Sequence, residues 1–304
     1  MHTLASGISY GALQFQRLPR IIATAVLQGP DGVALVDPGP ASALPVLRRH
    51  LAAIGASLAD VTTVLLTHIH LDHAGVAGTL VRENPRLRVM VHSVGAPHLV
   101  DPSKLLASAG RLYGDQMERL WGDVLPVPAS ALTALAGGET IVAGGRPWLV
   151  AATPGHASHH VSYFSPETGI AFVGDTAGVQ VLPGSFVLPP TPPPDIDVPL
   201  WMKSLDLIEQ WRPATLFLTH FGPTHTPAAH LAELRDHLQL VERLTRDAMA
   251  QTDDDDAREA WFIEQIRKVM SRRMGETDVQ AYQVAGRFDL NWRGMRRYVS
   301  KRPA

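Results

Sequence analysis

Four side chains that can bind a divalent metal lie within six consecutive positions of this 304-residue chain. They are His68, His70, Asp72 and His73, in the segment Thr67–Gly75. In a β-strand, residues two apart lie on the same side, so a strand that ends here would point His68 and His70 the same way. The turn that follows can bring Asp72 and His73 to a neighbouring point. Because such a cluster is costly to bury without a cation, it predicts a metal site that could serve two adjacent ions.

Three more polar residues follow apolar runs that read as strands. His156 comes after WLVAATPG, Asp175 after IAFVG and His220 after ATLFLT. Loops at strand ends converge on one edge of a sheet, so these residues are expected to join the first cluster. The combined set of five His and two Asp suits two divalent ions, with zinc the first expectation and manganese or iron as alternatives.

The composition limits the other classes of chemistry. The chain has no Cys, which excludes disulfides, cysteine nucleophiles and thiolate ligands. With 45% hydrophobic and 18% charged residues it is a globular sequence, and its net charge of −2 gives no global attraction to nucleic acid. No run approaches the ~18 apolar residues of a membrane helix, and the first residues do not resemble a secretory leader, so a cytoplasmic protein is predicted.

The elements that must position the cluster are short strands alternating with amphipathic helices. This alternation predicts an α/β or α+β fold. Strands are expected at Ile21–Leu27, Val33–Val36, Val61–Leu66, Leu87–His92, Thr140–Ala143, Trp148–Ala152, Val161–Phe164, Ile170–Val173 and Ala214–Thr219. Helices are expected at Ala41–Ile54, Ser103–Trp121 and Val198–Trp211, and from Pro227 to the end.

Two segments stand apart from this alternation. Residues Ser103–Trp121 carry an apolar stripe at helical spacing and predict a helical insertion at about 98–135. Residues Leu188–Pro199 contain six Pro, which suits an extended surface wall rather than a helix or central strand. Beyond residue 227, the helical stretch 228–304 ends in a basic region that we interpret as a solvated helix face.

At this point the chain resembles a known family. The ordered motifs THIHLDHAG, TPGHASHHVSYF, VGDTAG and LTHFGP are similar to those of the metallo-β-lactamase fold hydrolases, in particular hydroxyacylglutathione hydrolase (glyoxalase II) and related lactonases. The resemblance spans residues from about 20 to 225. It implies a four-layer αββα sandwich in residues 1–227, here with the helical insertion, followed by a helical C-terminal extension in 228–304.

The resemblance also implies roles for single residues. His68, His70 and His156 match the ligands of a first metal, and Asp72, His73 and His220 match those of a second, with Asp175 bridging the two. Two further residues match family positions that support the ligands without binding metal. Asp37 is expected to hold a ligating imidazole and His160 to give structural support, whereas His159 stands where the family usually has Gly.

The activity implied is hydrolysis of an ester, thioester or lactone by a hydroxide shared between two metals. A phosphodiesterase or nucleotide hydrolase on the same core, a single-iron sulfur dioxygenase and a non-enzymatic ligand sensor are the alternatives. A β-lactamase proper is disfavoured, because that group typically carries a Cys. Asp72 and Asp175 are the expected catalytic carboxylates, and Tyr113 is a weaker candidate for a hydrogen bond to the substrate.

Substrate choice is expected to follow the two unusual segments. Apolar residues in and beside them have no assigned strand to pack on, and together would form an apolar lid: Leu106, Tyr113, Met117, Trp121, Val187 and Leu188. Such a lid favours a small-molecule substrate with an apolar portion. No membrane or nucleic-acid partner is expected, and a homodimer is left open.

Overall fold

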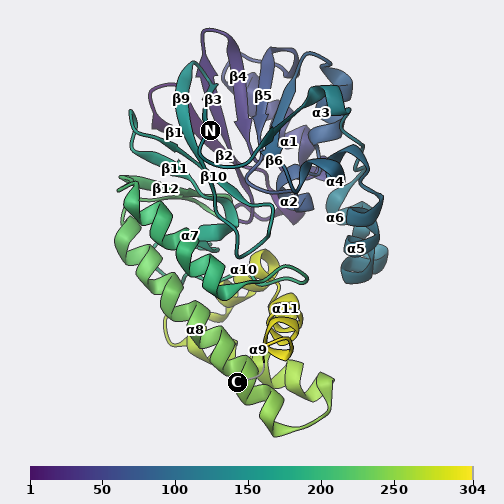
Figure 1. Ribbon diagram of the computed structural model, residues 1–304, viewed down its shortest axis with the longest axis vertical. Coiled ribbons are helices and arrows are strands. Elements are labelled where there is room, and N and C mark those ends of the chain that lie inside the picture. The colour runs from purple at the N-terminus through teal and green to yellow at the C-terminus, as the bar shows by residue number, and fades with distance from the viewer. Residues whose placement is uncertain (303–304) are drawn as a thin grey trace.

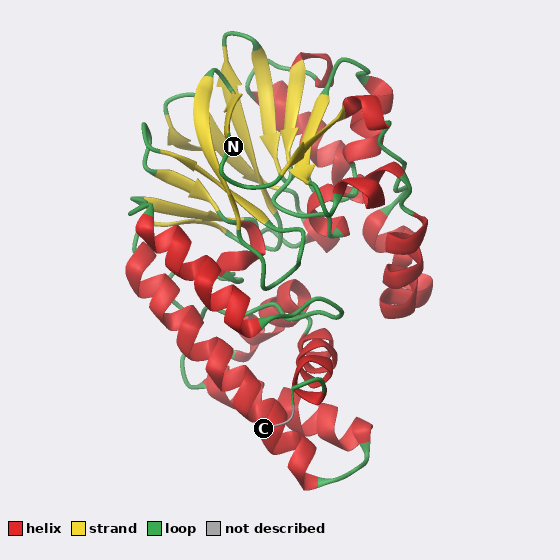
Figure 2. Ribbon diagram, in the orientation of Figure 1, coloured by secondary structure: helices red, strands yellow, loops and turns green. Residues whose placement is uncertain are grey.

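The computed structural model describes residues 1–302 and places two facing β-sheets between layers of helices (Figure 2). The α+β sandwich expected from the sequence is therefore confirmed. In the described chain, the first sheet follows chain order: β1 (His2–Ala5), β2 (Ile8–Ala12), β3 (Ala23–Gly29), β4 (Gly32–Val36), β5 (Val61–Leu65), β6 (Arg88–His92) and β7 (Leu132–Leu135). The second sheet has the order β13 (Gly222–Thr224), β12 (Thr215–Leu218), β11 (Ile170–Phe172), β10 (Val161–Ser165), β9 (Arg146–Ala152) and β8 (Thr140–Ala143).

The two sheets share a buried core. Leu27 and Leu65 of the first sheet cluster with Trp148 and Phe172 of the second, and all four side chains are fully buried. These positions alternate with outward-facing residues along each strand, as the two-residue repeat of a strand requires. Tyr163 adds a polar link, since its hydroxyl donates a 2.8 Å hydrogen bond to the carbonyl of Leu66. The sheets are thus joined directly beside the metal-ligand motif.

Helices cover the outer faces. Those outside the first sheet are α1 (Leu44–Ala53), α2 (Leu71–Ala74), α3 (Ala77–Glu83), α4 (Ala96–Val100), α5 (Ser103–Tyr113) and α6 (Met117–Trp121). The remaining helices are α7 (Val198–Gln210), α8 (Pro227–Gln251), α9 (Asp255–Ser271), α10 (Glu276–Gly286) and α11 (Phe288–Ser300). Figure 1 shows α8 to α11 extending from one end of the sandwich.

The C-terminal helices share a core with the second sheet. Trp201 of α7, Leu234 of α8 and Trp292 of α11 are fully buried in one cluster with Leu216 of β12. The predicted helical extension is confirmed as a fold feature, and its core is continuous with the sandwich. The division into domains 1–227 and 228–304 stays a prediction.

Some elements differ from the expectation. The insertion predicted at 98–135 is helical through α6 and has a 3-10 turn at Ala129–Ala131, but its last residues form β7 at the edge of the first sheet. Strands β1, β2 and β13 were not predicted either. Their Gly, Ala, Ser and Pro residues have low strand propensity, so these strands form because they pair with neighbouring strands of the sheet. In residues 1–302, no helix is long and apolar enough to cross a membrane.

Candidate metal centre

All seven predicted ligands lie at one edge of the two sheets, after strand ends. His68, His70, Asp72 and His73 follow β5, and the last two belong to the short helix α2. His156 lies in the loop after β9, Asp175 in the 3-10 turn after β11, and His220 after β12. Because β4 to β7 are parallel, as are β11 and β12, several strands end at this same edge.

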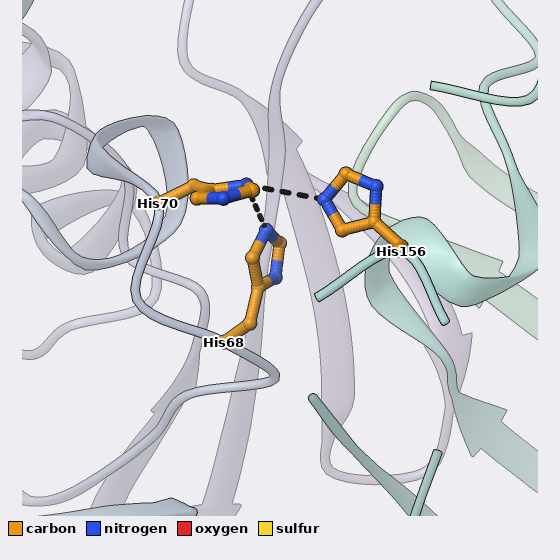
Figure 3. A group of neighbouring side chains, drawn as sticks. All are labelled: His68, His70 and His156. Carbon is orange, nitrogen blue, oxygen red and sulfur yellow. Dashed lines mark hydrogen bonds between the residues drawn. The ribbon is translucent and has the colours of Figure 1, made fainter. Parts of the chain in front are cut away.

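The first group consists of three imidazoles that face one another. The Nδ1 atom of His70 lies 2.9 Å from Nε2 of His68 and 3.1 Å from Nε2 of His156 (Figure 3). One nitrogen from each ring falls within 4.8 Å of the others, as a shared ion would require. His68 and His156 are buried, and His70 is partly exposed to the cavity described below.

The second group contains Asp72, His73 and His220. Asp72 Oδ2 lies 3.3 Å from His220 Nε2, and Asp72 Oδ1 lies 3.9 Å from His73 Nε2. These ligand atoms also fall within 4.8 Å of one another. The group offers two nitrogens and a carboxylate, a set that suits a borderline divalent ion.

Asp175 reaches both groups. Its Oδ2 lies 3.4 Å from His156 Nε2, while its Oδ1 lies 3.3 Å from His73 Nε2 and 3.6 Å from His220 Nε2. Asp175 Oδ1 and His73 Nε2 are buried without a hydrogen-bond partner in the described chain. Buried polar atoms are normally paired, so two orphans that face each other in a ligand cluster fit cations well.

The ionisation of the two groups differs. Burial lowers the pKa of His68 and His156, and it lowers that of His70 to about 4. These rings are therefore neutral, with a lone pair free for a metal. In His73 and His220 burial also acts to lower the pKa, but nearby carboxylates, Asp175 foremost, reverse the direction and raise it.

The two carboxylates are held ionised by the same contacts. Burial would raise the pKa of Asp72, but His73 and His220 outweigh it and lower the value to about 2. Asp175 behaves in the same way, because His73, His220 and His156 bring its pKa well below the usual range. Both side chains are thus available as anionic ligands.

Asp37 ties the ligand-bearing loops together. Its carboxylate accepts hydrogen bonds from the backbone N–H and hydroxyl of Thr67, both 2.8 Å, and from the Thr219 hydroxyl at 2.7 Å. His73 Nδ1 donates to the same carboxylate at 2.8 Å, which leaves His73 Nε2 free to face the site. Asp37 is fully buried and has a positive φ of 47°. These bonds hold that uncommon backbone conformation in place.

Other ligand rings are oriented through carbonyl or hydroxyl oxygens. His156 Nδ1 donates to the Pro190 carbonyl at 2.8 Å, and His220 Nδ1 donates to the Ile21 carbonyl at 2.6 Å. Each bond places the ring proton on Nδ1 and the lone pair on Nε2, which points into the site. Thr67, Thr219 and Pro190 were not foreseen, although a Thr precedes the His in both LTH motifs.

The other candidate residues lie around this centre. His160, expected to give support, is fully buried, stacks on His68 with ring centroids 5.0 Å apart, and pairs through Nδ1 with the Thr153 hydroxyl at 2.9 Å. His225, for which the sequence predicted no role, is not part of the ligand groups and does not border the cavity; its Nδ1 lies 3.1 Å from Thr215 Oγ1. Tyr113 borders the cavity beside the metal ligands, and burial raises its pKa.

A cavity of about 300 Å³ opens onto His70, Asp72, His156 and Asp175. Its walls come from the insertion, the Pro-rich segment and the junction between α10 and α11. The apolar lining residues are Ile69, Leu71, Val94, Leu105, Ala109, Leu112, Tyr113, Trp121, Pro190, Pro192, Pro193, Pro194, Ala285 and Leu290. The insertion and the Pro-rich segment therefore do flank the ligand cluster.

The expectation that six apolar residues form a lid over the site is wrong in part. Val187 and Leu188 are fully buried in the core beneath the C-terminal helices rather than facing a substrate. The sequence left them without a partner because the contact of this segment with distant helices is not visible locally. Leu106 and Met117 pack against the core under the first sheet and do not border the cavity, whereas Tyr113 and Trp121 do.

Comparison with known proteins agrees with this arrangement. Residues 17–220 match the sequence profile of the metallo-beta-lactamase superfamily. The chain is 28% identical over 218 residues to the metallo-beta-lactamase fold-containing protein ST1585 of Sulfurisphaera tokodaii, covering 71% of this chain and 77% of that protein. It is 32% identical over 151 residues to a hydroxyacylglutathione hydrolase of a Synechococcus species, covering 50% of this chain and 47% of the relative.

Solved structures show the same fold. The metallo-beta-lactamase family protein TTHA1429 of Thermus thermophilus superposes with a TM-score of 0.71 at 22% identity, over 98% of this chain and 95% of the other. ST1585 superposes with a TM-score of 0.64 at 23% identity, over 95% of this chain and 98% of the other. Since the superfamily profile matches more than half of the sequence, the protein belongs to the metallo-beta-lactamase superfamily of hydrolases.

Proposed function

We propose that the protein is a dinuclear metal-dependent hydrolase that cleaves an ester, thioester or lactone with an apolar portion. The observation that carries the proposal is Asp175, whose two carboxylate oxygens lie within 3.6 Å of nitrogens from both ligand groups. A carboxylate in this position suits a bridge between neighbouring ions. Seven ligands also exceed what one four-coordinate ion uses, which disfavours the single-iron dioxygenase.

The chain would hold the first ion through His68, His70 and His156, and the second through Asp72, His73 and His220. When bound, two divalent ions supply an activated water as the nucleophile and Lewis acidity for the scissile carbonyl. Zinc fits the nitrogen-rich set, and manganese or iron could also be accepted.

The protein's own contribution is to fix ligand atoms and protonation before a substrate arrives. Asp37 and the carbonyls of Pro190 and Ile21 hold three rings with Nε2 toward the site. Asp175 and Asp72 are ionised, so their oxygens act as ligands rather than as freely titrating bases. This preorganisation keeps the charges in place without reorganisation during the reaction.

The cavity supports a preference for neutral, apolar substrates. Most of its lining is aliphatic, aromatic or Pro, and it reaches the ligand cluster directly. An apolar wall stabilises an alkyl or aryl portion. Lys104 and Arg287 also line the cavity, but Arg287 is paired with Asp289, so the wall favours a neutral substrate over a charged phosphodiester. The relative named hydroxyacylglutathione hydrolase supports a thioester among the candidates, although the chain spans about half of that relative's length.

Metal analysis combined with a substrate panel tests the proposal. Protein purified without chelator is expected to hold about two ions per chain and to hydrolyse at least one of an aryl ester, an aryl thioester and a lactone. Stripping the metal with a chelator should abolish the activity, and adding zinc should restore it. A single ion per chain, or turnover of bis(p-nitrophenyl) phosphate alone, would contradict the proposed activity.

A further inference from the structure

His159 places an imidazole beside the metal ligands in a position none of the roles above uses. It lies in the loop between β9 and β10, with its ring centroid 5.6 Å from that of His70 and 6.1 Å from that of His68. The side chain is 9% exposed and borders the cavity. A buried polar ring at the wall of an apolar cavity needs a partner, so its surroundings identify what it can bind.

The chain around His159 makes room for this ring. A Cβ at Gly95 would lie 2.8 Å from Ile69 Cγ2 and 3.3 Å from His159 Cβ, so a larger residue there would crowd both. On the other side, the hydroxyl of Ser158 donates a 2.6 Å hydrogen bond to Asp195 of the Pro-rich segment. The backbone that carries His159 is therefore anchored to the cavity wall.

The tautomer of the ring follows from its surroundings. A neutral imidazole carries one N–H, on either Nδ1 or Nε2. Within residues 1–302, its buried Nδ1 has no hydrogen-bond partner. An orphaned N–H is costly inside a protein, which favours the proton on Nε2. Nε2 then becomes a neutral donor available to a molecule in the cavity.

We propose that His159 is a specificity-determining residue whose Nε2–H donates a hydrogen bond to the leaving-group oxygen of an ester or lactone. This inference rests on the proposed hydrolase function and narrows it to oxygen leaving groups. Sulfur is a weak hydrogen-bond acceptor, so a thioester gains little from the same donor. His159 would thus separate two substrates that the metal ligands alone treat alike.

The test compares phenyl hexanoate with S-phenyl hexanethioate, which share the acyl and aryl groups. In His159→Ala, kcat/KM for the oxygen ester should fall about tenfold and that for the thioester less than twofold, the size of one lost hydrogen bond. His159→Gln keeps an N–H donor and should recover most of the ester rate. His225→Ala, which removes a histidine outside the cavity, should change neither rate. Equal losses for both substrates, or none, would overturn the proposal.

A second readout does not depend on turnover. In ¹⁵N-histidine NMR spectra, the signal that disappears in His159→Ala should be that of a neutral ring protonated at Nε2, and it should shift when phenol, the leaving group of the ester, is added. A proton on Nδ1 or no response to phenol would refute the donor role. If neither substrate is hydrolysed while the NMR result holds, the proposed hydrolase function fails and the His159 donor stands.

Discussion

The hydroxyl of Thr219 donates a 2.7 Å hydrogen bond to the carboxylate of Asp37, although 182 residues separate the two. Thr219 directly precedes His220, and Asp37 also receives His73 Nδ1 at 2.8 Å. One buried carboxylate therefore orients the His73 ring directly and holds the residue before His220, although these two ligands follow strands of different sheets.

Asp37→Asn should weaken metal binding by the second group about 10- to 100-fold, the usual effect of removing a partner that orients a ligand. The amide replaces one acceptor oxygen by a donor that faces the donors of Thr67, Thr219 and His73. Thr24→Val is the matched control, because it removes another buried hydrogen bond, from Thr24 Oγ1 to the Val36 carbonyl. Metal titration with elemental analysis measures the effect, and equal affinity in both variants would show that Asp37 does not orient the ligands.

His220→Ala should reduce the metal content from about two ions per chain to about one, because it removes a ligand of the second group only. His68→Ala and Asp175→Ala should lower the hydrolysis rate at least ~100-fold while the far-ultraviolet circular dichroism stays unchanged, since the large core does not need metal to form. A parallel loss of circular dichroism and activity would indicate a structural site instead. His225→Ala provides the control for loss of an imidazole elsewhere.

The second group should lose its metal at a higher pH than the first. The pKa of His73 and His220 is raised, so protons compete with the metal for these rings at and above pH 6.5. The pKa of His70 is about 4, so the first group stays deprotonated well below pH 6. Affinity of the second group should therefore rise with pH, up to about tenfold per unit for each proton released, while that of the first stays level. Dialysis at pH 5.5 and 7.5 should leave about one and two ions, and equal loss from both groups would contradict the assignment.

Much of the fold and the candidate site could be predicted because the signals are local. The HxHxDH spacing after an apolar run, and single His or Asp residues after other runs, indicated the residues that the structure brings together at one edge. The strands from Val61 to His92 were predicted for the same reason, since β-branched and aliphatic runs carry their own propensity.

The rest depends on contacts between distant segments. Thr67 and Thr219 act through Asp37, and the Pro190 carbonyl acts through its position beside His156. A backbone carbonyl carries no residue-type signal, so its role could not be read from the sequence. Val187 and Leu188 were misassigned to a lid because the helices that bury them lie far along the chain. The Val187 carbonyl pairs with His237 of α8, 50 residues later, and the neighbouring Thr191 pairs with Asn291 of α11, 100 residues later.

Tyr113→Ala should flatten the dependence of rate on acyl chain length. In the parent protein, each added methylene that is buried should raise kcat/KM by up to about fourfold until the cavity is full. Tyr113 forms part of the wall together with Trp121, whose ring lies 5.0 Å away, and Arg287, which lies over the Tyr113 ring at 5.3 Å. A series of p-nitrophenyl esters from acetate to decanoate measures this dependence.

Met117→Ala is the matched control for that series, because Met117 lies on α6 but does not border the cavity. Trp121→Ala should flatten the series too, but its stacking on Phe15 at 5.4 Å predicts a further loss of ~3–5 kcal/mol in the free energy of unfolding. A flat series in the parent protein would disprove the apolar-wall preference.

Asn291→Ala tests whether the C-terminal helices affect the affinity of the first group for metal. Asn291 of α11 accepts a 2.8 Å hydrogen bond from the Thr191 backbone N–H and donates one of 3.3 Å to the Pro189 carbonyl. These residues flank Pro190, whose carbonyl orients His156. The substitution should lower the free energy of unfolding by ~1–3 kcal/mol, because it leaves buried backbone groups unpaired, and it should weaken the first metal several-fold.

Asn84→Ala separates these two effects. Asn84 is also buried, and its amide donates to the carbonyls of Val61 at 2.8 Å and Leu58 at 3.2 Å, which do not orient a predicted ligand. Urea unfolding should show a similar loss of stability in both variants, whereas metal titration should show weaker binding in Asn291→Ala alone. If both variants bind metal equally well, the C-terminal helices do not act on His156 through Pro190. A selective loss would show that the extension supports the metal centre in addition to the core.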